Sequence, residues 1–374
     1  MRLYPAVLHI FFILVITGFI TPDVNALQIT GRQDSTIKIG LLIQNNNSFA
    51  ARQGAELAIL KANETDGYKR KKFQLVVRSM EGPWGTGSKQ AVDLIFDEKV
   101  AVLMGSHDGR NAHLVEQVST KACIIFLSCW AGDLTLSQAF VPWFFSCIPN
   151  DLRQADALFE EVYNKRKLNN IAAISDNGYD SKLTMESFVK KAESEGKHIS
   201  LQLHYDIQNK DFNDLIIKIN KADITGIILF SQPSASLNII KKLEQKKMTQ
   251  TVFGSLSLLD EDEMPDHNLS DYKNIVLIYP RNLSGSKGLA FREEYMRKYG
   301  KLPGVVAAYS FDGMNILIEA IRKSGLDREK IQKTIAKMRY AGVTGLIQFN
   351  EKGKRIGTPG FMEIKNGVQV IPGK

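Results

Sequence analysis

Short apolar segments alternate with segments of helical periodicity along most of this 374-residue chain. Residues 37–43 (IKIGLLI), 73–77 (FQLVV) and 101–105 (AVLMG) each precede a stretch whose apolar residues recur every three to four positions. Continuous apolar runs of this length are typical of strands that are buried on both faces, and the helical stretches between them supply the cover. The alternation therefore predicts an α/β fold with a doubly wound parallel sheet.

The same alternation begins again after residue 150. A helix is expected first, because Ala155, Leu158, Phe159 and Val162 fall on one helical face, with Asn150 or Asp151 as its cap. The strand-like runs NIAAIS, ISLQLHY, ITGIILF and TVFGSL follow, with helical stretches between them. The chain therefore predicts a second doubly wound unit, which ends at the acidic loop LLDEDEMPDHNLSD.

A third section starts at the run IVLIYP (275–280) and contains mainly helices. Gly300 and Gly325 are the expected stop residues of two of these helices. Late strands follow, and the pair Asn366–Gly367 predicts a hairpin, because both residues of a type I′ turn take positive φ.

The first 26 residues have the composition of a secretory signal peptide. Arg2 precedes a mostly apolar segment over residues 6–20, and small residues lead up to Ala26. An uncleaved membrane anchor is the alternative, but the apolar segment is shorter than the roughly 20 residues that span a bilayer. We therefore expect cleavage after Ala26 and export of the mature protein to the periplasm.

Composition and charge place the chain among ordinary globular proteins, with 44% hydrophobic and 24% charged residues. The net charge is +8, but the basic residues alternate with acids in stretches such as KKLEQKK and REEYMRKYG. Surfaces that bind nucleic acid cluster their basic residues instead. We expect a solvated surface and no nucleic-acid partner.

Three cysteines, Cys123, Cys129 and Cys147, lie close together in the sequence. In an exported protein they form either one disulfide with one remaining thiol or three thiols that act as small apolar side chains. No CxxC motif supports a redox or zinc site.

Motifs for cofactors and metals do not fit. The stretch GPWGTGSK (82–89) has Ser88 and Lys89 in the reverse of the order that a phosphate-binding loop needs. The loop QNNNSFA after the first strand lacks the glycines of a dinucleotide site, and no G-x-S-x-G motif occurs. His107 and His113 would not share a face, so no metal site is expected, and no cofactor either.

The loop GSHDGRN follows the third predicted strand and allows two interpretations. His107 and Asp108 resemble a catalytic base and its partner, which would suggest an extracellular hydrolase, and His107→Ala would then abolish turnover. Alternatively, the backbone N–H groups at the start of the next helix, together with Arg110, bind an anionic ligand. Open α/β sheets bind ligands at this edge, so we favour ligand binding without catalysis.

Other polar or aromatic residues follow neighbouring strands at the same predicted edge. Trp130 in LSCWAGDLT offers a flat apolar wall, or packs beneath the loop. Tyr179, and Phe230 with Gln232 in FSQPS, occupy matching positions in the second unit. If the two units face each other, a ligand lies between these edges. The residues predicted to bind it are Ser48, His107, Asp108, Arg110, Ser128, Cys129, Trp130, Tyr179, Phe230 and Gln232.

The chain resembles the type I periplasmic solute-binding proteins of branched-chain amino acid ABC transporters. IKIGLLI with the GAELAI helix, VAVLMGS, FSCIPNDLRQADAL, NIAAISDNGYD, AAYSFDGMNILIEAIRKSG and GVTGLIQFNEKG carry the resemblance, in the family's order. It implies a non-enzymatic, monomeric protein with two lobes joined by three crossovers, which close on a ligand and deliver it to a membrane permease. Lobe 1 would comprise residues 36–148 and 276–344, and lobe 2 residues 149–275 and 345–374.

Several positions depart from the family's pattern. Ser128, Cys129 and Trp130 stand at the positions of a Ser-Ala-Thr segment that binds an amino acid's α-carboxylate and ammonium, and Tyr179 stands at the Tyr of a Tyr-Gly pair. Gly109 replaces a hydroxyl-bearing residue, and the indole of Trp130 and the imidazole of His107 suit a planar or aromatic ligand. The ligand is therefore expected to be an amino acid or related carboxylate, including aromatic or planar ones. A sensory module read by a membrane receptor is the alternative role.

Overall fold

A computed structural model describes residues 36–105, 108–138, 141–208, 211–264 and 273–370. These residues belong to one compact unit, Thr36–Lys374, which contains two main sheets and a small two-stranded one. The predicted signal peptide and cleavage site lie outside the described residues. Among the described residues, no helix combines the length and the apolar character that crossing a membrane requires.

The first sheet has the order β2-β1-β3-β4-β5, and every pair of neighbouring strands is parallel. Its strands are β1 (Thr36–Ile43), β2 (Lys72–Ser79), β3 (Val102–Gly105), β4 (Phe126–Ser128) and β5 (Phe144–Ser146). The three apolar runs singled out in the sequence form β1, β2 and β3, so the prediction of a parallel sheet is confirmed.

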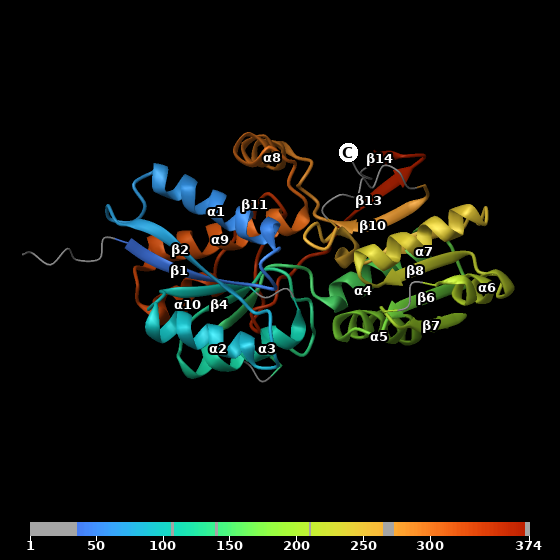
Figure 1. Cartoon of the computed structure of the whole chain (residues 1–374), viewed down its shortest axis with the longest axis horizontal. Coiled ribbons are helices and arrows are strands. Elements are labelled where there is room, and N and C mark those ends of the chain that lie inside the picture. Colours follow the sequence, from blue (N-terminus) through green and yellow to red (C-terminus); the bar gives the residue numbers. More distant parts are fainter. Residues whose placement is uncertain (1–35, 106–107, 139–140, 209–210, 265–272, 371–374) are drawn as a thin grey trace, which may run out of the picture. The chain divides into compact units, whose positions relative to one another are not determined.

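Helices cover both faces of this sheet (Figure 1). They are α1 (Phe49–Glu64), α2 (Thr86–Val92) with a π-helical turn (Asp93–Asp97), α3 (Gly109–Lys121) and α9 (Val305–Ser324). Helix α8 (Ser286–Tyr299) packs on α1 and α9, and α10 (Arg328–Ala336) packs on α9. Apolar residues of α1 and α9 pack on one face of the sheet, and those of α2 and α3 pack on the other. The late helices therefore return to the first sheet, as the family resemblance implies.

Helices α1 and α9 approach each other closely at Gly54. A Cβ atom built on Gly54 would lie 2.2 Å from the carbonyl oxygen of Ala307. Backbone atoms on both sides leave no room for a side chain, so the two helices would have to move apart.

We expect Gly54→Ala to reduce the free energy of unfolding by roughly 1–3 kcal/mol, the usual cost of overpacking a tight core contact. Denaturant unfolding followed by circular dichroism would measure this loss. Leu60→Ala, at an exposed position of the same helix, serves as a comparison. An unchanged midpoint for Gly54→Ala would contradict the close packing of α1 and α9.

The second sheet has the order β14-β13-β10-β9-β8-β6-β7. Its strands are β6 (Ile171–Asp176), β7 (Leu201–Tyr205), β8 (Gly226–Phe230), β9 (Thr251–Gly254), β10 (Ile275–Tyr279), β13 (Gly360–Lys365) and β14 (Val368–Val370). The strands from β6 to β10 are parallel, whereas β13 and β14 are antiparallel additions. Its helical segments are α4 (Asp151–Phe159) with a π-helical turn (Glu160–Lys165), α5 (Tyr179–Ser194), α6 (Asn213–Lys221), α7 (Pro233–Gln245) and a 3₁₀ turn (Leu256–Leu259).

The expected division between the two lobes needs one correction. Strand β10 pairs with β9 and β13 in the second sheet, so the chain returns to the first unit after Tyr279 and not at residue 276. The run 275–280 is a sheet strand because it is buried between two neighbours. Strands β11 (Tyr340–Gly342) and β12 (Gly345–Ile347) pair only with each other before the chain enters the second sheet again.

Two buried charged residues stabilise the last crossover between the units, which contains β11 and β12. Asp312 in α9 accepts hydrogen bonds from the N–H groups of Val343 and Thr344, at 2.9 and 2.8 Å. Arg355 donates to the carbonyl oxygens of Cys147 and Thr344, at 2.8 and 3.1 Å. The crossover segments are therefore held by specific polar contacts as well as by packing.

Local predictions of turns and caps are confirmed. Asn366 and Gly367 have φ of 49° and 80°, and they join the antiparallel strands β13 and β14. Gly300 ends α8 with φ of 69°. The Asn150 side chain accepts a hydrogen bond from the N–H of Arg153 and so caps α4.

The three cysteines are all free thiols, with Cys129 and Cys147 buried and Cys123 exposed. Of the two alternatives that the sequence leaves open, thiols without a disulfide are therefore present. Burial raises the pKa of Cys129 to about 12, so this thiol is unreactive at neutral pH.

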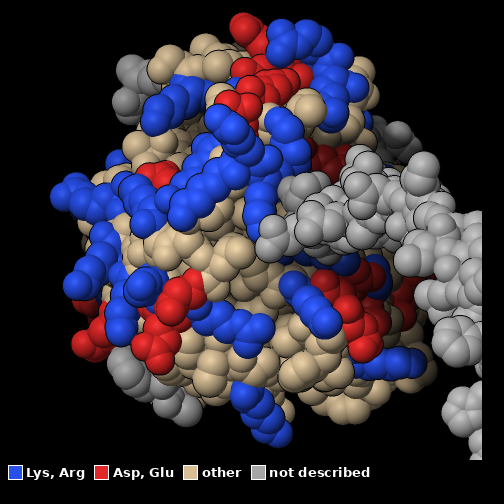
Figure 2. Space-filling view, turned by 90° about the vertical axis from the view of Figure 1, so that its left-hand side faces the viewer, with Lys and Arg blue, Asp and Glu red and all other residues tan. Residues whose placement is uncertain are grey.

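Basic side chains cover much of one face of the molecule, and acidic side chains interrupt them (Figure 2). Around the end of α9 and in α10, Lys323 pairs with Glu319 and Lys333 with Glu329, both four residues apart on a helix. Such pairing along exposed helices is typical of a solvated surface, and it agrees with the interpretation of the charge pattern in the sequence.

Candidate ligand-binding site

The candidate site is a cavity at the carboxyl ends of strands from both main sheets. Loops that follow β1, β3, β4 and β5 meet loops that follow β6, β8 and β9. The lining residues are Gln44, Asp108, Trp130, Ala131, Gly132, Asp133, Ile148, Asp151, Gln154, Asp180, Ser181, Thr184, Phe230, Gln232, Ser255, Leu256, Ser257 and Asp260. Five of these carry a carboxylate, and none of the described residues in the lining is Lys, Arg or His.

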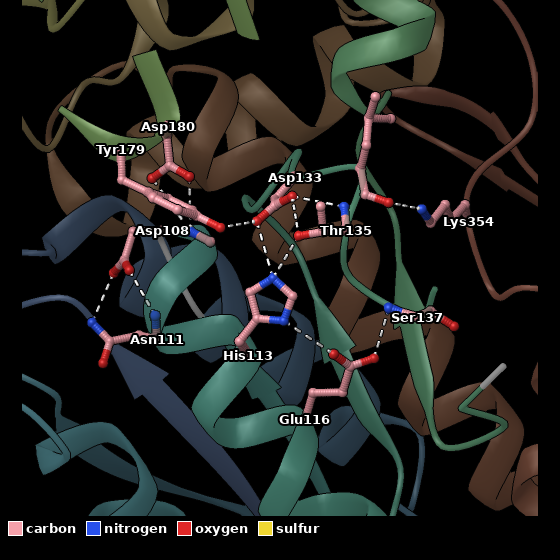
Figure 3. A network of polar contacts seen from close by, with 12 residues as sticks. Asp108, Asn111, His113, Glu116, Asp133, Thr135, Ser137, Tyr179, Asp180 and Lys354 are labelled. Atoms are coloured by element: carbon pink, nitrogen blue, oxygen red, sulfur yellow. Dashed lines mark hydrogen bonds and ion pairs between the residues drawn. The ribbon is translucent and has the colours of Figure 1, made fainter. Parts of the chain in front are cut away.

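Asp108 is the N-cap of α3. Its Oδ1 accepts from the Asn111 N–H at 2.8 Å, and its Oδ2 accepts from the Asn111 side-chain amide at 2.9 Å (Figure 3). A capping aspartate satisfies a free N–H group and stabilises the positive end of the helix dipole. This local role explains an aspartate at this position without any catalytic partner. His107, the other member of the suspected pair, lies outside the described residues.

A different histidine and aspartate form the polar network beside the cavity (Figure 3). His113 Nε2 lies 3.1 Å from Asp133 Oδ2 and 2.8 Å from Thr135 Oγ1, and Nδ1 lies 3.5 Å from Glu116 Oε2. The Tyr179 hydroxyl donates to the same Asp133 oxygen at 3.0 Å. Since Tyr179 begins α5 and Asp133 follows β4, this contact joins the two α/β units.

The pKa values of His113 and Asp133 move in opposite directions. Hydrogen bonds to Asp133 and then Glu116 raise the pKa of His113 to about 9. Burial favours a higher pKa for Asp133, but hydrogen bonds from His113, Thr135 and Tyr179 outweigh it and lower that pKa to about 2. At neutral pH the network therefore contains an imidazolium between two carboxylates, and His113 has no free nitrogen for general-base chemistry.

A second contact joins the units at the start of α3. The N–H of Gly109 donates to Asp180 Oδ1 at 3.0 Å. A Cβ atom on Gly109 would lie 2.7 Å from this Asp180 oxygen and 2.9 Å from Asp133 Oδ2. The hydroxyl-bearing side chain common in the family would collide here, so glycine allows the carboxylate of Asp180 to reach the backbone.

This contact changes what the helix terminus does. The sequence predicts that the N–H groups here and Arg110 meet an anionic ligand, but in the structure the Gly109 N–H binds the protein's own Asp180. The guanidinium of Arg110 lies 5.0 Å from the ring centre of Tyr179 and does not line the cavity. The terminus is therefore already neutralised by a carboxylate.

Three carboxyl groups of the lining have raised pKa values. Burial and then the charge of Asp180 raise the pKa of Asp151 to about 8. Burial and then the charge of Asp108 raise the pKa of Asp180 to about 7. Burial, followed by the charge of Glu261, raises the pKa of Asp260 well above its usual value. The cavity thus concentrates buried carboxyl groups, and the charges of Lys354 near Asp151 and Arg110 near Asp180 offset the raised pKa values only in part.

The structure brings only some of the predicted site residues to the cavity. Asp108, Trp130, Phe230 and Gln232 line it. The other described members of the predicted set, none of which lines it, are Ser48, Arg110, Ser128, Cys129 and Tyr179.

The residues that miss the cavity have structural roles. The Ser128 hydroxyl is buried and accepts from the N–H of Ala131 at 3.2 Å. The buried Ser48 hydroxyl accepts from the N–H of Asn45 at 3.3 Å. Cys129 packs in the core. The Tyr179 hydroxyl binds Asp133 instead of facing the cavity. Small side chains directly after a strand are thus used here to shape loops.

Sequence reasoning missed most of the carboxylates. Asp133 lies three residues after Trp130, inside the quoted loop LSCWAGDLT, and Asp260 opens the acidic loop that marks the end of the second unit. Asp151 was considered only as a helix cap. A search for aspartates shortly after predicted strands identifies Asp133. It does not reveal that Asp151 and Asp260 are buried.

Comparisons with known proteins support the fold. The model of a protein family described as periplasmic binding protein matches residues 36–367 of this chain.

Similar solved structures include the branched-chain amino acid transporter substrate-binding protein LivJ from Streptococcus pneumoniae in complex with isoleucine. That protein is 20% identical with a TM-score of 0.79, and the match covers 90% of this chain and 100% of LivJ. The leucine-binding protein LivK from Thermotoga maritima is 18% identical with a TM-score of 0.76, covering 90% and 97%. A solute-binding protein from Rhodopseudomonas palustris in complex with 3,4-dihydroxybenzoic acid is also 18% identical, with a TM-score of 0.76 and coverage of 88% and 93%. These similarities establish a shared two-unit α/β fold.

Proposed function

Because the chain belongs to the periplasmic binding protein family, we propose that it is an exported solute-binding protein that delivers a small ligand to the membrane permease of an ABC transporter. The ligand is an amino acid or a related small molecule, bound in the cavity between the two α/β units. A solute-binding protein of this kind needs no catalytic group of its own.

The observation that carries this proposal is the position of the cavity. It lies at the carboxyl ends of parallel strands from both sheets, where open α/β folds bind ligands. Residues from seven segments that follow strands reach it, so one ligand touches both units at once. A ligand that contacts both units stabilises their association.

The similar structures indicate the size of the ligand. LivJ binds isoleucine, and the Rhodopseudomonas palustris protein binds 3,4-dihydroxybenzoic acid. Trp130 and Phe230 provide ring surfaces in the present cavity, which suit an aliphatic chain or a planar group. A molecule of amino-acid size is therefore the class of solute that we propose.

Binding also affects the contacts that already join the units. The Tyr179 hydroxyl bonds to Asp133, and the Gly109 N–H bonds to Asp180, on either side of the cavity. A ligand held by the same loops adds to these contacts, and its release requires them to open. The permease then distinguishes the ligand-bound protein, in which these contacts are reinforced, from the ligand-free protein.

Thermal unfolding in the presence of a broad collection of small solutes tests this proposal. A true ligand raises the melting temperature as its concentration rises, because about 2.7 kcal/mol is added at a concentration 100 times the Kd. Tryptophan fluorescence should change in the same titration, and Trp130→Phe should remove that change. If no small solute of any charge raises the melting temperature, the proposed function is wrong.

A further inference from the structure

The proposed function leaves the chemical class of the ligand open, and the lining of the cavity narrows it. Resting on that function, we propose that the ligand is an organic cation with two protonated amino groups, bound by the carboxylates of Asp151 and Asp260. A diamine and a basic amino acid share this chemistry. A neutral zwitterion and an acid do not.

Asp151 is the first carboxylate that requires a partner. Its side chain lines the cavity, the residue is only 4% exposed, and it forms no ion pair with a described residue. The Thr184 hydroxyl lies 3.1 Å from Asp151 Oδ1, but also 2.9 Å from the carbonyl oxygen of Asp180. One hydroxyl proton serves only one of these acceptors at a time. Oδ2 of Asp151 accepts no hydrogen bond from any described residue and is not one of the fully buried unpaired atoms, so it is open to a donor in the cavity.

Asp260, from the segment that follows β9 in the same unit, provides the same feature. It lines the cavity, is 6% exposed, and its Oδ1 accepts from the N–H of Asp262 at 3.0 Å. Its Oδ2 has no hydrogen-bond donor among the described residues. Burying a carboxylate without a donor or a cation costs several kcal/mol. A ligand ammonium group supplies both the proton donor and the opposite charge.

Two backbone N–H groups at helix starts beside the cavity, of the kind that binds a ligand carboxylate, are already occupied. The N–H of Gly109, at the start of α3, is bound by Asp180 at 3.0 Å. The N–H of Gln232, before α7, is bound by the buried Asp176 at 2.8 Å. Both helix termini are therefore neutralised by the protein itself. Together with the absence of basic side chains among the described lining residues, this disfavours an anionic ligand.

The walls of the cavity favour an organic cation over a metal ion. Trp130 and Phe230 line it, and aromatic faces attract ammonium groups. In the described part of the chain, no group of three or more His, Cys, Asp or Glu side chains is arranged to hold a metal ion. Carboxylates on different loops instead suit a ligand with separated positive charges.

Calorimetric titration with two matched pairs of probes tests the inference. L-Lysine differs from L-norleucine by one terminal amino group, and 1,4-diaminobutane differs from 4-aminobutyrate by an aminomethyl group in place of the carboxylate. We expect the dibasic member of at least one pair to bind more than tenfold more tightly. A preference confined to lysine identifies a basic amino acid, and one confined to the diamine identifies a polyamine.

Variants of the two aspartates test whether their carboxylates cause the preference for dibasic ligands. Asp151→Asn and Asp260→Asn retain the shape of the side chain and one oxygen acceptor. Each should lower the affinity for the dibasic probe by roughly 10- to 100-fold, as expected for the loss of a charged hydrogen bond. Asp214→Asn, at an exposed position of α6, makes the same chemical change outside the cavity and should have no effect. A cooperative unfolding transition at or above the wild-type melting temperature would show that the variants remain folded.

The inference fails if norleucine and 4-aminobutyrate bind as tightly as their partners, if no probe binds, or if calcium alone binds in a manner that a chelator reverses. These outcomes differ from failure of the proposed function. If the solute collection yields only neutral or acidic ligands, the protein is still a solute-binding protein and only the cationic class is wrong.

Discussion

Replacing Asp151 with asparagine is expected to stabilise the ligand-free protein at pH 8, although the same change weakens binding. The buried carboxyl has its pKa raised to about 8 from an ordinary 3.8. A carboxyl with a raised folded-state pKa contributes stability below its unfolded pKa and loses it progressively as the pH rises toward the folded value. Each pKa unit corresponds to about 1.4 kcal/mol, so the wild-type loss amounts to several kcal/mol.

Asparagine does not ionise, so the variant avoids this loss and should unfold at a higher denaturant concentration at pH 8. The charges of Asp180 and Asp133 raise the pKa at this position, whereas Thr184 and Lys354 oppose them. Well below the ordinary pKa of 3.8 the difference between variant and wild type should vanish, because the wild-type carboxyl is then largely protonated in both states. A variant that is less stable than wild type at pH 8 would contradict the buried, uncompensated carboxylate.

Replacing His113 with alanine should have the opposite effect on stability. Hydrogen bonds to Asp133 and Glu116 raise the pKa of His113 to about 9 from 6.5. A histidine with a raised folded-state pKa contributes stability that is fully present below pH 6.5 and is lost as the pH rises through about 9. The shift corresponds to about 3 kcal/mol at pH 6.

Unfolding curves of the wild type and His113→Ala at pH 6 and pH 10 measure this contribution. The difference between them should be large at pH 6 and much smaller at pH 10, because the wild-type imidazole is neutral at the higher pH. His198→Ala, at an exposed position, serves as the control. A difference of equal size at both pH values would assign the effect to packing instead of charge.

The regular elements could be predicted from the sequence because their signals are local. The continuous apolar run 37–43 predicts a buried strand, and β1 occupies that place. The pair Asn366–Gly367 predicts its turn from backbone preferences alone, and both residues have positive φ. The sheet to which β10 belongs could not be predicted in this way, because it depends on pairing with strands far away in the sequence.

The chemistry of the site depends on contacts that no local pattern shows. Asn150 and Asp151 were equivalent candidates for the cap of α4, but Asn150 became the cap and Asp151 turned to the cavity. The burial of Asp151 arises from loops of both units together. His113 likewise becomes an imidazolium only because Asp133, from another loop, and Glu116 meet it. Sequence reasoning located the edge of the sheets that holds the site, but not the sign of its charge.

Native mass spectrometry of the purified protein tests the central claim most directly, because it detects and identifies a solute that remains bound. We predict a retained small molecule with more basic than acidic groups, and its loss from protein that carries Asp151→Asn. A retained molecule without a basic nitrogen, or one that the Asp151 variant holds as well as the wild type, would contradict the account.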